Sequence, residues 1–181
     1  VADACEGQDV PVTITGLGTL TNVNFEYDLS GANNAINNMV SVPVTSGSAT
    51  FNIPAALLIN TGTTTIQITD LTNTGNSCGV IVSGVSDSFV INPNPIATLV
   101  SSDADNTICA NEAATLTVNP TNFIATAATY VWTLNTVVIP GASTNSIPLT
   151  ASGTYELTTS LNGCPFVLST SFVANPLPLA T

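Results

Sequence analysis

The residues best suited to chemistry in this chain are four cysteines and a small set of acids. The cysteines lie at positions 5, 78, 109 and 164, and the chain contains no Lys, Arg or His. Zinc sites need closely spaced cysteines or histidines, which are absent here. The spacing instead predicts one bridge per half, Cys5–Cys78 and Cys109–Cys164. Because disulfides persist in oxidising compartments, this predicts export. The alternative is four free, buried thiols in a cytosolic protein.

Two groups of polar residues are candidates for a functional site. Asp103, Asp105 and Asn106 lie just before Cys109, and their oxygens suit calcium, which takes six to eight oxygen ligands. The alternative is a solvated turn in which these side chains bind their own backbone. Glu26 and Asp28 share one face of a predicted strand, as a glycosidase pair would. They are expected to face solvent without a cleft, so we predict no catalysis.

The missing basic residues exclude several classes of function. Binding to nucleic acid or to anionic membranes depends on Lys and Arg. A P-loop needs its Lys, and an acyl-transfer triad needs a base that is usually His. We therefore predict that the chain is not an enzyme and takes no cofactor apart from the calcium hypothesis. With a net charge of −11 and no cationic side chain, we also expect no salt bridge, so apolar burial, sheet hydrogen bonds and disulfides must supply the stability.

The chain contains an internal repeat, which indicates its domain organisation. Residues 88–98 (SFVINPNPIAT) and 171–181 (SFVANPLPLAT) are identical at eight of eleven positions. We predict two homologous domains, residues 1–97 and residues 98–181, each ending in Asn-Pro-x-Pro. Proline-rich linkers favour extended, semi-rigid geometry. The second copy of the motif predicts a linker to a further repeat.

Short alternating segments between turn residues predict an all-β fold. In the first half we expect strands at residues 12–15, 23–29, 40–44, 49–53, 64–69 and 80–91, and one helical turn at 54–58. In the second half we expect strands at residues 115–118, 130–134, 145–150, 154–161 and 166–173, with a hairpin turn at Asn162-Gly163. This pattern is typical of immunoglobulin-like β-sandwiches. We predict two of them in tandem, in an extended arrangement.

Aromatic residues at strand spacing are predicted to form the cores of the two domains. The candidates are Phe25, Tyr27, Tyr130, Trp132 and Tyr155. The alternative is a surface platform on which sugar rings stack. In antibody domains a disulfide lies beside the core Trp. Here we expect Trp132 to fill its core without one.

The second half resembles a known family of repeats. Ile108-Cys109, Tyr130-Val131-Trp132, Ser152-Gly153-Thr154-Tyr155 and Asn162-Gly163-Cys164 follow one another in the order seen in Ig-like or PKD-like repeats of giant Bacteroidota surface adhesins. These adhesins are secreted by the type IX system and include the SprB-type gliding adhesins. The first half is similar over less of its length, because it lacks the Trp and the Ser-Gly-Thr-Tyr segment.

The resemblance implies a structural and adhesive segment of a long extracellular filament at the cell surface, used in attachment or gliding motility. The implied partners are neighbouring repeats of the same chain, other filament chains, or a glycan or substratum surface. The alternative is a glycan-binding accessory module of a secreted multidomain protein. That alternative predicts a cluster of exposed aromatic side chains.

Overall fold

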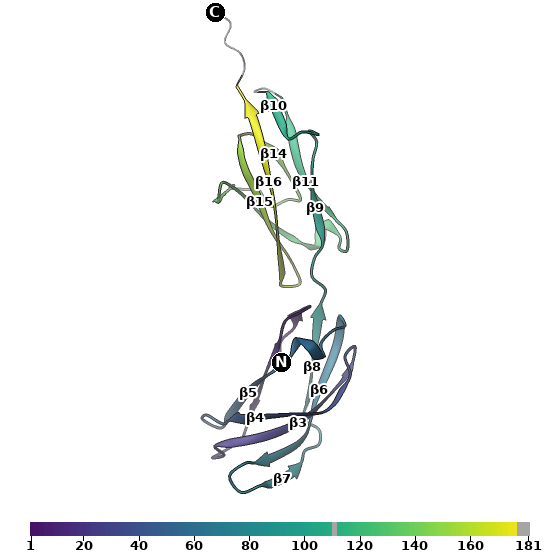
Figure 1. Cartoon of the computed structure of the whole chain (residues 1–181), viewed down its shortest axis with the longest axis vertical. Coiled ribbons are helices and arrows are strands. Elements are labelled where there is room, and N and C mark those ends of the chain that lie inside the picture. The colour runs from purple at the N-terminus through teal and green to yellow at the C-terminus, as the bar shows by residue number, and fades with distance from the viewer. Residues whose placement is uncertain (110–111, 177–181) are drawn as a thin grey trace, which may run out of the picture. The chain divides into compact units, whose positions relative to one another are not determined.

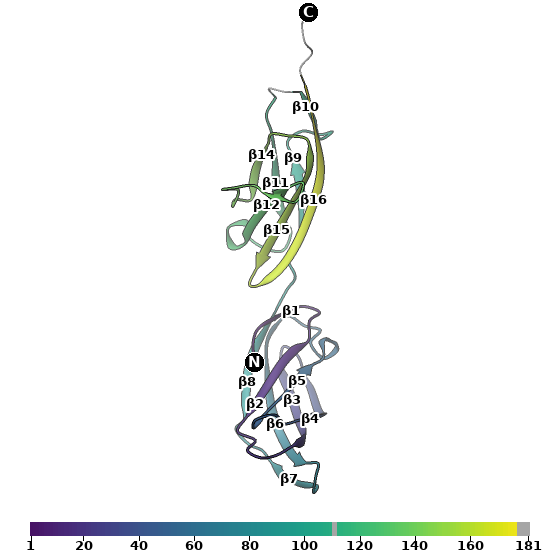
Figure 2. The same cartoon turned by 90° about the vertical axis from the view of Figure 1, so that its left-hand side faces the viewer.

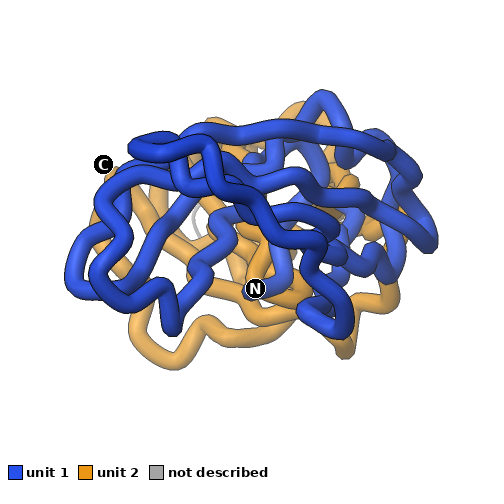
Figure 3. The backbone as a smooth tube through the Cα atoms, turned by 90° about the horizontal axis from the view of Figure 1, so that it is seen from below, with its two compact units in different colours: residues 1–93 blue, residues 94–181 orange. Residues whose placement is uncertain are grey.

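A computed structural model describes residues 1–109 and 112–176 of the chain (Figures 1 and 2). The chain divides into two compact units, Val1–Pro93 and Asn94–Thr181 (Figure 3). This boundary lies a few residues before the predicted one at residue 97. Residues 177–181, which include the end of the second Asn-Pro-x-Pro motif, lie outside the described residues, so the predicted linker to a further repeat stays a prediction.

Unit 1 consists of two β-sheets that enclose one core. The larger sheet has the strand order β1-β8-β6-β3-β4, with β7 also paired to β6, and the smaller sheet pairs β2 with β5. The strands are β1 (Ala4–Cys5), β2 (Val10–Thr15), β3 (Asn22–Gly31), β4 (Ala35–Pro43), β5 (Ser48–Ile53), β6 (Gly62–Asn73), β7 (Cys78–Ile81) and β8 (Ser86–Asn92). A single 3-10 turn, η1 (Ala55–Leu57), confirms the predicted helical turn.

Unit 2 repeats this plan with a different division of strands. One sheet has the order β10-β16-β15-β12-β13 and the other the order β14-β11-β9. The strands are β9 (Ala97–Ser101), β10 (Thr107–Cys109), β11 (Ala114–Pro120), β12 (Thr129–Leu134), β13 (Val137–Val138), β14 (Ser146–Leu149), β15 (Gly153–Leu161) and β16 (Cys164–Asn175), and the 3-10 turn is η2 (Ala125–Ala127). The part of the chain that the structure describes contains no α-helix.

Alternating side chains explain how each sheet pair closes over a core. Along β3 every second residue is buried, including Phe25 and Tyr27, as expected when successive side chains point to opposite faces. In unit 2 the buried aromatic residues are Tyr130, Trp132 and Tyr155, and Trp132 has no exposed surface. The five aromatic residues therefore lie in two separate cores, one for each unit.

The strand predictions differ from the structure in two informative places. The strand expected at residues 80–91 is two strands, β7 and β8, which pair with successive parts of the same neighbour, β6. Strands β1, β9, β10 and β13 were not predicted. Of these, β1, β10 and β13 have only two or three residues, which show no alternation. The predicted hairpin turn is confirmed, because Asn162 and Gly163 have φ values of 50° and 83° between β15 and β16.

The expectation that no salt bridge can form is wrong at one place. The Val1 ammonium group lies 2.7 Å from Oδ2 of Asp87. The cation comes from the backbone terminus, which a count of basic side chains overlooks. This hydrogen bond lowers the pKa of Asp87, together with the Ser88 N–H that its other oxygen accepts and the attraction of the ammonium charge.

Candidate functional site

The cysteines do not pair as the sequence predicts. Cys5 and Cys164 are each disulfide-bonded, whereas Cys78 and Cys109 are free, exposed thiols. The predicted bridges Cys5–Cys78 and Cys109–Cys164 are therefore wrong. In each unit, the two cysteines lie too far apart to form a disulfide.

In unit 1, β1 with Cys5 and β7 with Cys78 lie at opposite ends of the larger sheet (Figure 2). Cys5 is the register partner of Asn92, next to the pair formed by Gly62 and Ile91, whereas Cys78 is the partner of Asn73. Gly62 and Asn73 are the first and last residues of β6, which has 12 residues. At about 3.3 Å per residue they are roughly 35 Å apart. A disulfide needs Cα atoms within about 7 Å.

Unit 2 separates its cysteines in the same way. Cys164 is the first residue of β16, and Cys109 is the parallel partner of Asn175 at the end of the same 12-residue strand. The length of β16 again places the two residues roughly 35 Å apart. We call Cys5 and Cys109 the linker cysteines, because each lies beside the Asn that precedes the linker proline. We call Cys78 and Cys164 the hairpin cysteines, because each begins the second strand of a hairpin.

Both linker cysteines are held in the same kind of turn. The Cys5 N–H donates to Oε1 of Gln8 at 3.2 Å, and the Gln8 N–H donates back to the Cys5 carbonyl at 3.1 Å. The Cys109 N–H donates to Oε2 of Glu112 at 2.8 Å, and the Glu112 N–H returns to the Cys109 carbonyl at 3.0 Å. The two hairpin cysteines also match, because each pairs with the last residue of the preceding strand.

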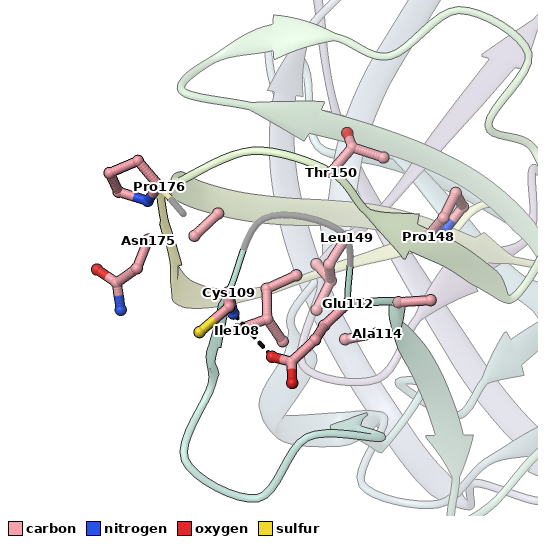
Figure 4. A pocket seen from close by; sticks show the side chains of 11 residues that line it. Ile108, Cys109, Glu112, Ala114, Pro148, Leu149, Thr150, Asn175 and Pro176 are labelled. Carbon is pink, nitrogen blue, oxygen red and sulfur yellow. Dashed lines mark hydrogen bonds between the residues drawn. The ribbon is translucent and has the colours of Figure 1, made fainter. Parts of the chain in front are cut away.

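The two free thiols each border an apolar hollow. Beside Cys109 a hollow of about 500 Å³ is lined by Ile108, Ala114, Leu149 and other small or apolar residues (Figure 4). In this view Glu112 reaches the Cys109 backbone along the edge of the hollow, and the Cys109 sulfur lies at the outside. Cys78 borders a second hollow of about 310 Å³ with Leu20, Leu71 and Val80. Sequence reasoning missed both hollows, because their residues come from strands far apart in the chain.

The acidic turn brings two of its three candidate residues together. Oδ1 of Asp103 and Oδ1 of Asp105 both accept the Thr107 N–H, at 3.0 Å each. Hydrogen bonding with the Asp105 side chain and with the Thr107 N–H lowers the pKa of Asp103. Asn106 adopts a positive φ of 57°, and its carbonyl accepts the Val173 N–H. The turn thus fastens β10 to β16.

These contacts are those of the solvated-turn alternative. Calcium binding at Asp103, Asp105 and Asn106 stays a prediction. Within residues 1–109 and 112–176, no group of three or more Cys, Asp or Glu side chains is placed to hold a metal ion.

The pair Glu26 and Asp28 lies on the face of β3 that points away from the core, and both residues are half-buried. Oδ1 of Asp28 accepts the Asn37 N–H at 2.8 Å, and a Glu26 oxygen accepts the Thr69 hydroxyl at 3.5 Å. Both carboxylates therefore fasten neighbouring strands to β3, which is a structural role.

Every aromatic side chain in the chain belongs to a described residue, and none of them is exposed. Eight are buried, and the remaining two, Phe123 and Phe166, are half-buried and pack edge to face with ring centroids 6.4 Å apart. Stacking on a sugar requires an accessible ring face. The surface of the described residues therefore offers no aromatic platform for a glycan.

Two buried hydrogen-bond clusters were also missed. In unit 2 the Tyr155 hydroxyl accepts the N–H groups of Thr150 and Ala151 and donates to the Ala151 carbonyl, at 3.1 to 3.3 Å. In immunoglobulin domains such a tyrosine corner precedes the second core cysteine by two residues. Here that position is Leu157, which is fully buried. This explains how Trp132 fills its core with no disulfide beside it.

Unit 1 has no tyrosine at the corresponding corner and uses an amide instead. Nδ2 of the buried Asn33 donates to the Asn60 carbonyl and to the Thr64 hydroxyl, both at 2.9 Å. The Asn60 N–H donates to Oδ1 of Asn33 at 2.9 Å. A spacing of about thirty residues conceals this contact in the sequence, so only the folded chain reveals it.

No protein-family model matches the chain, and no curated protein matches it in sequence. Solved structures resemble it in fold. A marsupial T cell receptor aligns with 99% of this chain and 72% of its own, at 15% identity and a TM-score of 0.52. An amphioxus IgVJ-C2 molecule aligns with 96% and 99% of the two chains, at 14% identity and a TM-score of 0.40. The first four Ig domains of Dscam1 isoform 8.4 align with 97% and 43%, at 15% identity and a TM-score of 0.36.

Among the described residues, no helix has the length and apolar character needed to cross a membrane. The likeness to the T cell receptor shows an all-β, immunoglobulin-like fold, as the sequence predicts.

Proposed function

We propose that this chain is a structural and adhesive repeat segment of a long, secreted filament at the cell surface. The observation that carries the proposal is that both units have the same connector where the chain leaves them. In unit 1 Cys5 pairs in parallel with Asn92, and in unit 2 Cys109 pairs in parallel with Asn175. A proline follows each Asn. A connector that is built twice in the same way is what a tandem array requires.

The residues around the linker support a semi-rigid connection. The Asn92 carbonyl accepts the Glu6 N–H within unit 1. Beyond Pro93, the Asn94 carbonyl accepts Nδ2 of Asn122 and the Ile96 N–H donates to Oδ1 of Asn122, both within unit 2. Each side of the linker is thus fastened to its own unit, and proline fixes the backbone angle φ of the residue between them. This favours an extended arrangement.

The fold and the disulfide support an extracellular role. Disulfide-bonded cysteines fit an oxidising compartment. The immunoglobulin-like fold suits a binding surface, and the role proposed here is adhesion rather than catalysis. The alternative of a glycan-binding module predicts an exposed aromatic cluster, and all ten aromatic side chains are instead buried or half-buried. We therefore do not carry that alternative further.

Immunogold electron microscopy of cells that produce the chain tests this function. Antibodies raised against the purified chain should label surface filaments at repeated positions along their length. Label confined to the cytoplasm, or to dispersed protein in the medium with none on the surface, would contradict the proposal. Cells from which the gene has been deleted provide the control for antibody specificity.

A further inference from the structure

The cysteines of the two units are related by the repeat, but they differ in oxidation state. Each unit has one linker cysteine and one hairpin cysteine, in matching backbone surroundings. The two cysteines that are each disulfide-bonded are one of each kind, Cys5 and Cys164. The free residues are also one of each kind, Cys109 and Cys78. Each position is therefore bonded in one unit and unbonded in the other, so both positions are built for a disulfide.

The free thiols cannot find partners within their own units. Cys78 lies roughly 35 Å from Cys5, and Cys109 lies as far from Cys164, because a 12-residue strand separates them in each case. Cys5 and Cys164 are, moreover, already oxidised. Both free thiols are exposed, so a further copy of the chain can approach them.

We propose that the Cys109 thiol of one copy of this chain forms a disulfide with the Cys78 thiol of the next copy. This pairs a linker cysteine with a hairpin cysteine, the two kinds that the repeat provides. Because the two thiols lie on different parts of the surface, the contact is heterologous, and repetition of it gives an open chain rather than a closed dimer. The inference rests on the proposed function, which supplies the further copies, and it adds covalent links to the array.

The reaction is a thiol–disulfide exchange with a small-molecule or protein disulfide as the oxidant. The Cys109 thiolate attacks the oxidant, forms a mixed disulfide and releases one thiol. The Cys78 thiolate of the next copy then attacks the Cys109 sulfur, and the second thiol of the oxidant leaves. Two cysteines are oxidised, one disulfide is reduced to two thiols, and the two cysteine protons are transferred to the departing thiolates.

Two features of the surface bear on this link. The apolar hollows beside Cys109 and Cys78 provide surface that a neighbouring copy can cover. In contrast, each copy has a net charge of −11, so separate copies repel one another. A disulfide would hold neighbouring copies together against this repulsion. Salt screens such repulsion, so the link should form faster at high ionic strength.

Oxidation of the purified chain with oxidised glutathione at high salt tests the proposal. We expect a ladder of multimers on non-reducing gels, which collapses to monomer on reduction. Cleavage after acidic residues separates all four cysteines into different peptides, since Asp or Glu lies between each of them and the next. Mass spectrometry should then find the peptide pair with Cys78 and Cys109 in excess over the two homotypic pairs.

Two single variants determine the pairing rule. Cys78→Ser and Cys109→Ser should each remain monomeric, and an equimolar mixture of the two should give dimers and nothing larger. Dimers from either variant alone would overturn the proposal, as would a wild-type chain that stays monomeric or links Cys78 to Cys109 within one copy. Trp132 fluorescence verifies that unit 2 of each variant is folded. Filament labelling by immunogold does not depend on this result, so the two proposals can fail separately.

Discussion

The buried ring of Trp132 stabilises unit 2. Its ring is fully buried, and Nε1 donates to the Thr144 carbonyl at 2.8 Å. Replacement of a buried Trp by Ala typically costs about 3–5 kcal/mol, a large part of a domain stability of about 5–15 kcal/mol. We therefore expect Trp132→Ala to unfold or severely weaken unit 2 while unit 1 melts nearly as before.

Thermal melts followed by circular dichroism check this expectation. Val131→Ala is a matched control, because Val131 is the preceding residue of the same strand and its side chain is 47% exposed. It should lower the melting temperature only slightly. A Trp132→Ala chain that melts like wild type would show that the ring contributes little to the core.

Ionisation of the Tyr27 phenol makes the stability of unit 1 depend on pH in the alkaline range. Burial raises the pKa of Tyr27 above its ordinary value of about 10. The folded state therefore retains the phenol proton more tightly than the unfolded state. This contribution to stability is complete below about pH 10 and is lost as the pH rises through the higher pKa of the folded state. Tyr130 in unit 2 is affected in the same direction by its own burial.

Unfolding by urea at several pH values between about 8 and 12 tests this effect. Tyr27→Phe removes the ionisable group and keeps the ring, so the alkaline loss of unit 1 stability should become smaller. Unit 2, followed through the single Trp132, should keep its own pH dependence. An unchanged alkaline slope for unit 1 would show that the Tyr27 phenol is not what titrates.

Individual residues differ in how far their roles can be predicted. Alternation along β3 and β12 is sufficient to assign Phe25 and Trp132 to cores, because a strand that lies on a core has one buried face. The same rule does not locate cysteines along the length of a sheet. Pairing Cys5 with Cys78 requires knowing that a full strand separates them, which depends on register rather than composition.

At the scale of elements, the side chain of Asn122 fastens the second half of the linker to unit 2. Its amide nitrogen binds the Asn94 carbonyl at 2.9 Å, and its oxygen binds the Ile96 N–H at 2.8 Å. Asn122→Ala removes both hydrogen bonds, so we expect the two units to tumble more independently. Backbone nitrogen-15 relaxation should then give shorter and unequal correlation times for the two units.

Asn119→Ala provides the control for this experiment. Asn119 is an exposed residue of the preceding strand β11 and is the register partner of Thr98, so its removal should leave the correlation times unchanged. If Asn122→Ala behaves like Asn119→Ala, the two hydrogen bonds of the Asn122 side chain do not determine the stiffness of the linker.

The elements themselves were predicted where the pattern is long and missed where it is short. The Asn162-Gly163 turn was found because Asn-Gly supplies the two positive φ values that a tight hairpin needs. Strands β1 and β10 were missed, although they place the linker cysteines beside Asn92 and Asn175. They are held by parallel pairing with the last strand, which leaves no local pattern in so few residues.

For the whole molecule, we predict that two of the four cysteines are oxidised and two are free. Treatment of the native chain with iodoacetamide should modify Cys78 and Cys109 and leave Cys5 and Cys164 unmodified until a reductant is added. Mass spectrometry after cleavage at acidic residues identifies the modified positions. Modification of all four cysteines in the native chain, or of none, would contradict the pattern on which the copy-to-copy link depends.

Small-angle X-ray scattering tests most directly whether the chain is a stiff, extended segment of a longer array. An extended arrangement of two units of about 90 residues, with centres one 12-residue strand length or roughly 35 Å apart, would have a radius of gyration of about 21 Å. A single compact body of this chain length would have a value of about 16 Å. We expect a long, thin particle near the larger value, and a particle near the smaller value would contradict the extended arrangement.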